Sequence, residues 1–130
     1  MYHLEYESEH AYVIINALDL LARIHMGQIG EIRSILSEGQ FTPEQLNKVA
    51  ALCDEIKEVL GFAPGASFGI YNEKVPRVGR VAWDIQSVIR QVIARTEKHG
   101  AHSVWLQDPM HSVADLPLPT CWNDTLAGSK

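Results

Sequence analysis

The chain has 130 residues, of which 46% are hydrophobic and 21% are charged, and its formal net charge is −5. These values predict one domain over residues 1–130, and they argue against general binding to DNA or RNA, which needs a broad basic surface. No segment reaches the ~20 consecutive apolar residues of a membrane-spanning helix, so no membrane partner is expected.

The charge is distributed unevenly along the chain. Residues 1–73 carry four basic and eleven acidic side chains, whereas residues 74–130 carry seven basic and five acidic ones. An anionic partner is therefore expected to be small and to bind the second half of the chain.

The first elements predicted are a short strand and a long helix. Apolar residues alternate with polar ones over residues 2–6, which is the period of a strand. Ser8 is a suitable N-cap, and the helix that follows is expected to end near Met26. Because this helix is apolar around almost its whole circumference, it is predicted to be buried at the centre of the fold.

Two further helices are predicted before residue 61. Isoleucines between Ile29 and Ile35 share one face of a short helix, which Gly39 ends. Residues 42–45 read Thr-Pro-Glu-Gln, a capping box with proline at the first helical position, and they begin a third helix that Gly61 closes.

The second half is predicted to hold a loop, one strand, one helix and a tail. Residues 68–71 are expected to pair with the N-terminal strand, and the fourth helix to run from near Pro76 to about His99. Residues 101–130 contain three prolines and several large apolar side chains, so they are expected to form an extended tail that packs on the domain or on a neighbouring subunit. The predicted fold class is thus mainly α with a minimal two-stranded element, with four helices around a buried first helix.

The segment 61–80 is the strongest candidate for a ligand site. Its glycines allow backbone N–H groups to approach a ligand, three cations follow within a short distance, and a helix begins there. Such groups together form anion sites. The predicted ligand-binding residues are Gly65, Ser67, Gly69, Tyr71, Lys74, Arg77 and Arg80. Either Tyr71 or Trp83 is available to stack on a nucleotide base.

A purely structural interpretation of the same segment is also open. The glycines then serve turn geometry, and Arg77 and Arg80 pair with nearby acids such as Glu73 and Asp84. The segment lacks the lysine and hydroxyl residue of a phosphate-binding P-loop, and no dinucleotide-binding fingerprint surrounds it.

A second polar group lies on the first helix and just after it. Arg23 and Gln28 are candidate ligand donors, although a pair between Asp19 and Arg23, with Gln28 holding the bend at Gly27, explains them as well.

Catalytic and metal-binding patterns are weak. His99, His102 and His111 lie near Asp108 but lack the close paired spacing of zinc ligands, so no metal is expected. No catalytic triad, carboxylate pair or redox dithiol is present, so no cofactor is expected and a non-enzymatic protein is favoured.

One spacing resembles that of a nuclease family. Six residues separate Arg95 from His102, which is similar to the motif of HEPN-domain ribonucleases, in which the two residues act on the scissile phosphate. The chain departs from that motif because Thr96 follows the arginine and Gly100 interrupts the helix.

Longer stretches resemble small, uncharacterised proteins of tailed bacteriophages and prophages. The resemblance lies in the sequences of residues 17–32, 68–72 and 80–90. It implies a bacteriophage context and no particular activity. It also implies that Arg23, Gln28, Asn72, Arg80 and Asp84 converge in one region. The members other than Arg80 are then expected to form a second layer around the ligand.

The sequence thus favours a non-enzymatic phage accessory protein in the cytoplasm of its host, with a homo-oligomer expected. In its sharpest form it is a counter-defence sponge that sequesters a small phosphorylated, nucleotide-like ligand. The alternatives are a protein–protein inhibitor of a host factor, with the acidic first half or the apolar tail as its contact surface, and a HEPN-like ribonuclease.

Overall fold

A computed structural model describes residues 1–97 and 111–124, which contain four α-helices. These are α1 (Ser8–His25), α2 (Glu31–Leu36), α3 (Pro43–Val59) and α4 (Arg77–Glu97). The mainly helical fold class predicted from the sequence is confirmed.

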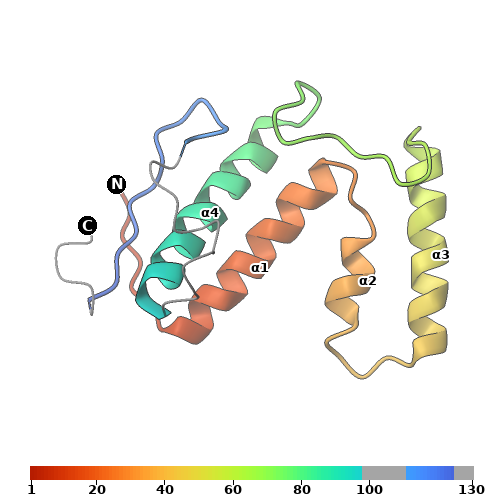
Figure 1. Cartoon of the computed structure of the whole chain (residues 1–130), viewed down its shortest axis with the longest axis horizontal. Helices are drawn as coiled ribbons and strands as arrows, with labels where there is room; N and C mark the ends of the chain where they lie inside the picture. Colours follow the sequence, from red (N-terminus) through yellow and green to blue (C-terminus); the bar gives the residue numbers. More distant parts are fainter. Residues whose placement is uncertain (98–110, 125–130) are drawn as a thin grey trace.

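The core lies between α1 and α4, which pack side by side over most of their length (Figure 1). Ala11 and Ile15 of α1 pack against Ile89 of α4. Near the other end of the pair, Gly79 allows a close approach, because a Cβ atom there would meet Cβ of His25 at 3.0 Å.

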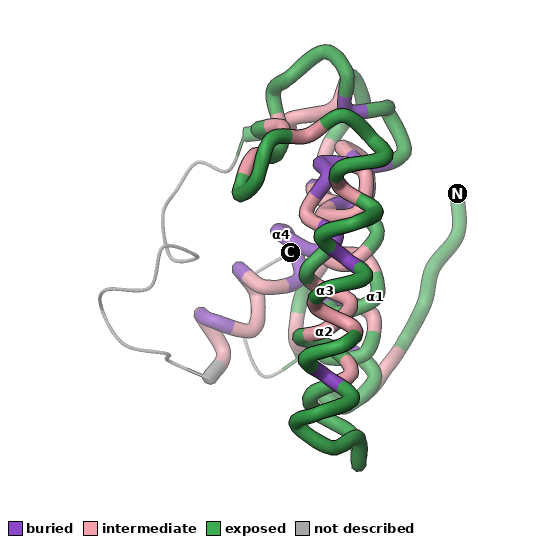
Figure 2. Tube along the Cα trace, turned by 90° about the vertical axis from the view of Figure 1, so that its right-hand side faces the viewer, coloured by how far each residue is buried: buried purple, intermediate pink, exposed green. Residues whose placement is uncertain are grey.

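The helices α2 and α3 form a hairpin beside this pair. Figure 1 shows α4, α1, α2 and α3 following one another in a row, and in the rotated view of Figure 2 α1 and α2 lie behind α3. Among the described helices, α3 contacts only α2, and α2 in turn contacts α1. The helices therefore form one layer rather than a bundle with a shared centre.

The predicted start of α3 is confirmed in atomic detail. The backbone N–H of Gln45 donates to Oγ1 of Thr42 at 3.1 Å, and the N–H of Thr42 donates to Oε1 of Gln45 at 2.9 Å. Pro43 occupies the first turn, and Gly61 ends the helix with a φ of +84°. A capping box thus satisfies two backbone donors that the helix start leaves without intrahelical partners.

The two terminal segments meet beside α4. Residues 111–124 run along the side of α4 that faces away from α1 (Figure 1). Asp84 of α4 holds the start of this segment, and the hydroxyl of Tyr6 lies 3.5 Å from Sγ of Cys121 near its end.

The expectation of paired strands is wrong. Residues 2–6 and 68–71 form no strand, and the described residues contain none elsewhere. An alternating pattern indicates a strand only when a partner supplies the ladder of hydrogen bonds. Here the backbone N–H of Phe68 instead donates to the carbonyl of Met26 at 2.8 Å.

The expectation that the first helix is buried all round also needs correction. Ala11, Ile15 and Ala22 are buried, but Val13 is 66% exposed. In a single layer, α1 has neighbours on two sides and leaves part of its circumference uncovered.

No helix within the described ranges has the length and apolar character needed to cross a membrane.

Candidate functional site

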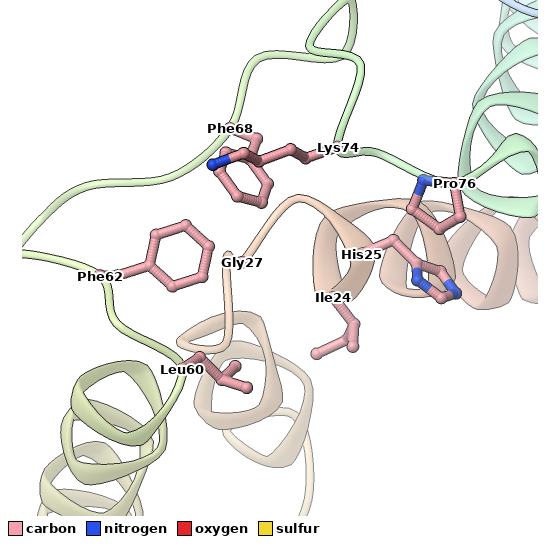
Figure 3. Close-up of a pocket in the computed structure, with 8 residues that line it drawn as sticks. All are labelled: Ile24, His25, Gly27, Leu60, Phe62, Phe68, Lys74 and Pro76. Carbon is pink, nitrogen blue, oxygen red and sulfur yellow. The ribbon is translucent and has the colours of Figure 1, made fainter.

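The most informative concavity lies where the C-terminal end of α1 meets the connection between α3 and α4 (Figure 3). The hollow has a volume of about 290 Å³. Its lining consists of Ile24, His25, Gly27, Leu60, Phe62, Phe68, Lys74 and Pro76. We refer to these eight residues as the aromatic hollow.

Two phenylalanine rings form one wall of the aromatic hollow. The ring centroids of Phe62 and Phe68 lie 4.9 Å apart with an interplanar angle of 59°. Such a tilted arrangement is favoured between aromatic rings, because the positive edge of one approaches the negative face of the other. The pair therefore supplies an apolar surface suited to a flat ring.

Gly27 fixes the position of this wall. Its φ is +83°, and a Cβ atom at this position would overlap the ring of Phe62. The glycine is thus needed both for the left-handed backbone and for the space that the phenylalanine occupies. Together with the bond from Phe68 to Met26, it holds the connection against the end of α1.

Two lysines place positive charge on the rings. Nζ of Lys74 lies 5.7 Å from the centroid of Phe68, and Nζ of Lys57 lies 5.8 Å from that of Phe62. Both distances are within the range of cation–π attraction. In the part of the chain that the structure describes, neither ammonium group has a carboxylate within 4.0 Å. Lys74 is also one of the residues lining the aromatic hollow, so an anion seated there would have it as a partner.

The other cations of the predicted site are held elsewhere. Nε of Arg77 lies 2.6 Å from Oδ1 of Asp115, and both side chains are exposed. This guanidinium lowers the pKa of Asp115 through a hydrogen bond and charge attraction. A guanidinium nitrogen of Arg80 donates to the carbonyls of Tyr71 and Asn72, at 3.4 and 2.6 Å. Neither arginine lines the aromatic hollow.

The remaining predicted ligand residues also lie outside the aromatic hollow. The side chains of Ser67 and Tyr71 are exposed, as are Gly65 and Gly69. Gly65 has a φ of +75° and therefore serves a turn. Whether any of these residues binds a ligand stays a prediction.

The residues that the resemblance groups together are divided among three places. Arg23 donates to Oδ2 of Asp19 at 2.8 Å and to Oε1 of Gln28 at 2.6 Å, and its guanidinium lies 5.8 Å from the ring centroid of Trp83. Trp83 is thus engaged by an arginine rather than facing the hollow.

The remaining members of that group lie elsewhere. Arg80 donates to the backbone carbonyls given above, while Asn72 and Asp84 accept hydrogen bonds mostly from backbone N–H groups. Oδ1 of Asn72 accepts from the N–H of Lys74 at 2.9 Å. Asp84 is only 4% exposed and accepts hydrogen bonds from the segment at 112–114. It does not pair with Arg80, so the interpretation of these two as an ion pair is wrong.

A second, smaller hollow of about 140 Å³ lies between α4 and the C-terminal segment. Its lining is Val81, Asp84, Ile85, Leu116, Pro117 and Pro119. This volume is well below the ~300 Å³ at which small-molecule pockets begin.

Other predictions lie partly outside the described residues. Arg95 belongs to α4, but His102 of the ribonuclease-like motif falls outside the described ranges, as do His99 and Asp108. Within those ranges, no group of three or more metal-ligating side chains comes together.

Comparison of the chain with protein-family models, with curated proteins and with solved structures found no match.

The sequence indicated Lys74 but not the phenylalanines beside it. Phe62 and Phe68 flank the glycine-rich stretch at a spacing of six residues. Two aromatic residues on either side of a turn are the signal that could have indicated an apolar wall.

Proposed function

We propose that this protein binds, without chemically altering it, a small molecule that has a flat ring and an anionic group. The observation that supports this most directly is the Lys74 ammonium group beside the paired rings of Phe62 and Phe68, at the edge of a hollow. The flat ring would lie against the phenylalanines, and the anionic group would pair with the lysine.

The size of the aromatic hollow restricts the ligand. A volume of about 290 Å³ is at the lower limit of small-molecule pockets, which run from roughly 300 to 1,000 Å³. One ring system with its anionic substituent fits this volume better than a complete dinucleotide does. A larger ligand would have to leave its second half outside.

The lining favours binding over catalysis. His25 and Lys74 are the lining residues that can exchange a proton, and no hydroxyl, thiol or carboxylate group is among the described residues that line the hollow. A hydrolytic or group-transfer reaction ordinarily needs a nucleophile or an activated water molecule beside such a base.

A phosphorylated nucleotide is the ligand class that we propose. Its base has the flat apolar faces that phenylalanine binds, and its phosphate has the charge that lysine pairs with. In the bacteriophage context implied by the resemblance, sequestration of a nucleotide signal would serve as counter-defence.

Thermal unfolding with a ligand panel tests this proposal. The panel contains a nucleoside, inorganic phosphate, nucleoside monophosphates and cyclic nucleotides. Because a ligand that binds only the folded state stabilises it, a nucleotide at 100 times its Kd should add about 2.7 kcal/mol and raise the Tm. The nucleoside and phosphate alone should give smaller shifts, and mass spectrometry should recover the nucleotide intact.

Two variants distinguish the aromatic hollow from the site predicted by the sequence. Lys74→Ala should abolish most of the nucleotide-dependent shift, whereas Arg77→Ala, which removes an equal charge outside the hollow, should retain it. Binding that survives Lys74→Ala and is lost with Arg77→Ala would place the ligand elsewhere. No shift with any member of the panel would contradict the proposed ligand class.

A further inference from the structure

An apolar stripe on α3 is exposed over two turns of the helix. Leu52 is 56% exposed, Ile56 43% and Val59 85%. Figure 2 looks onto the outer side of α3 and shows most of its residues exposed. Exposed apolar side chains that are contiguous on one helix mark an interaction surface more often than singly scattered ones do.

The spacing of this stripe is that of a helix–helix seam. Val49, Leu52, Ile56 and Val59 follow one another at intervals of three, four and three residues. This alternation repeats every seven residues and brings the side chains to one line along the helix. We call these four residues the α3 seam. The buried residues Leu46 and Cys53 belong to a neighbouring line, and α2 is the helix that α3 contacts.

Two opposite charges flank one edge of the α3 seam. Lys48 and Glu55 are both exposed and stand seven residues apart, so they occupy equivalent positions in successive heptads. Charged residues at such flanking positions determine which helices pair and in which orientation. When two copies of α3 pack antiparallel around a two-fold axis near Leu52, Lys48 of one copy faces Glu55 of the other, and the same contact occurs twice.

We propose that the α3 seam is the interface of a homodimer in which two α3 helices pack antiparallel. The two-fold axis repeats the contact between Lys48 and Glu55, as an isologous interface requires. A parallel arrangement would bring the two edges of the seam together, placing Lys48 and Glu55 opposite Cys53 and Leu60 instead of opposite each other. Charge complementarity therefore selects both the partner, a second copy, and its orientation.

The single-layer architecture leaves the same surface of α3 uncovered by the rest of the described chain. Folded domains ordinarily bury apolar faces between two packed layers. In this row of helices α3 is at the end, and α2 is its only helical neighbour among the described residues. A second copy would cover the side of α3 that the chain itself leaves open.

The size of the contact predicts a weak dimer. A helix of 17 residues is about 25 Å long at a rise of ~1.5 Å per residue. One helix pair of this length falls at the low end of specific interfaces, where association is transient. We expect dimers that form at micromolar concentration and dissociate on dilution.

Analytical ultracentrifugation over a dilution series tests the interface. The wild-type chain should change from dimer to monomer, and Leu52→Glu should require at least about tenfold higher concentration to dimerise. Val13→Glu is the matched control, because it places the same charge at an exposed apolar position on α1 and should leave dimerisation unchanged. Circular dichroism verifies that both variants are folded.

Charge exchange tests the antiparallel orientation. Lys48→Glu alone and Glu55→Lys alone should each weaken dimerisation, because like charges then face one another, and the double exchange should restore it. An equimolar mixture of the two single variants should form heterodimers, since each acidic position then faces a lysine.

Several outcomes would overturn this proposal. A wild-type chain that remains monomeric throughout the dilution series contradicts it, as does a dimer that Leu52→Glu leaves unchanged. Single charge variants that dimerise as well as the wild type would contradict the antiparallel arrangement. Failure of nucleotide binding would not affect any of these results, because the α3 seam and the aromatic hollow have no residue in common.

Discussion

At the scale of single residues, Gly27 is the position where backbone and side-chain constraints coincide. Its positive φ is accessible to glycine without penalty, and the missing Cβ atom leaves room for the ring of Phe62. Gly30, three residues later, has a φ of −59° and open space where a Cβ atom would be. Gly30 is therefore a matched control for a substitution at Gly27.

Gly27→Ala should therefore destabilise the fold, whereas Gly30→Ala should not. We expect a loss of roughly 1–2 kcal/mol from the left-handed backbone alone, together with displacement of the Phe62 ring. Gly30→Ala should be neutral or slightly stabilising, because alanine restricts the unfolded chain. Urea unfolding measures both effects. Equal stabilities for the two variants would show that the backbone at Gly27 relaxes freely.

Asp84 is the second residue on which much structure depends. Its carboxylate accepts from the hydroxyl of Ser112 at 2.8 Å and from the backbone N–H groups of Val113 and Ala114 at 2.9 and 3.1 Å. One buried side chain on α4 thus satisfies three donors of a segment about thirty residues away.

Asp84→Asn should cost about 1–3 kcal/mol, because the amide has one acceptor oxygen for three donors and adds a donor of its own. Asp84→Ala should cost at least as much. Limited proteolysis should show faster cleavage within 111–124 in both variants, while Asp54→Asn, at an exposed position on α3, should leave the rate unchanged. An unaltered cleavage pattern in Asp84→Ala would mean that other contacts hold the segment.

The sequence could identify the charged residues of the candidate site but not their partners. Lys74 was predicted as a ligand residue and does line the hollow, while Arg77 pairs with Asp115, thirty-eight positions along the chain. Local sequence reveals where charges are, yet the neutralising group depends on how the C-terminal segment packs. The same holds for Asp84, whose donors come from residues 112–114.

At the scale of elements, helix boundaries followed the sequence closely because capping is a local property, although Glu7 rather than Ser8 is the N-cap of α1. The ends of α3 are set by Thr42 with Gln45 and by Gly61, all within a few residues of the helix. Strands depend on distant pairing, and the segments at 2–6 and 68–71 have no such partner here. Periodicity also could not reveal that α1 lies in a single layer, which leaves part of its apolar surface exposed.

Thr42→Ala should lower the stability of the chain by about 1 kcal/mol, since the cap is exposed and the loss is confined to the hydrogen bonds of the helix start. Thr42→Ser keeps the hydroxyl group and should retain most of the stability. Urea unfolding followed by circular dichroism compares the three proteins. A stability for Thr42→Ala equal to that of Thr42→Ser would show that the hydroxyl is dispensable.

At the scale of the whole molecule, the two ends of the described chain are joined through Tyr6 and Cys121. Burial is the main factor that raises the pKa of the Tyr6 hydroxyl, and the hydrogen bond with the Cys121 thiol adds to it. Both favour the neutral phenol in the folded state.

Because the pKa of Tyr6 is higher in the folded than in the unfolded chain, its contribution to stability is complete below the ordinary value of 10.0 and decreases as the pH rises above it. The free energy of unfolding should therefore fall in strongly alkaline solution. Tyr6→Phe, which cannot ionise, should show a smaller fall, while Tyr71→Phe at an exposed position should behave as the wild type. Parallel curves for Tyr6→Phe and the wild type would contradict this assignment.

The aromatic hollow lies between two parts of the molecule. Ile24 and His25 belong to the helix pair, whereas Leu60 and Phe62 follow directly from the outer hairpin, so the walls come from both halves of the row. A molecule bound between them would act as a clamp that restrains the hairpin relative to its neighbours. Binding in the hollow would then be thermodynamically linked to the position of the hairpin relative to α1 and α4.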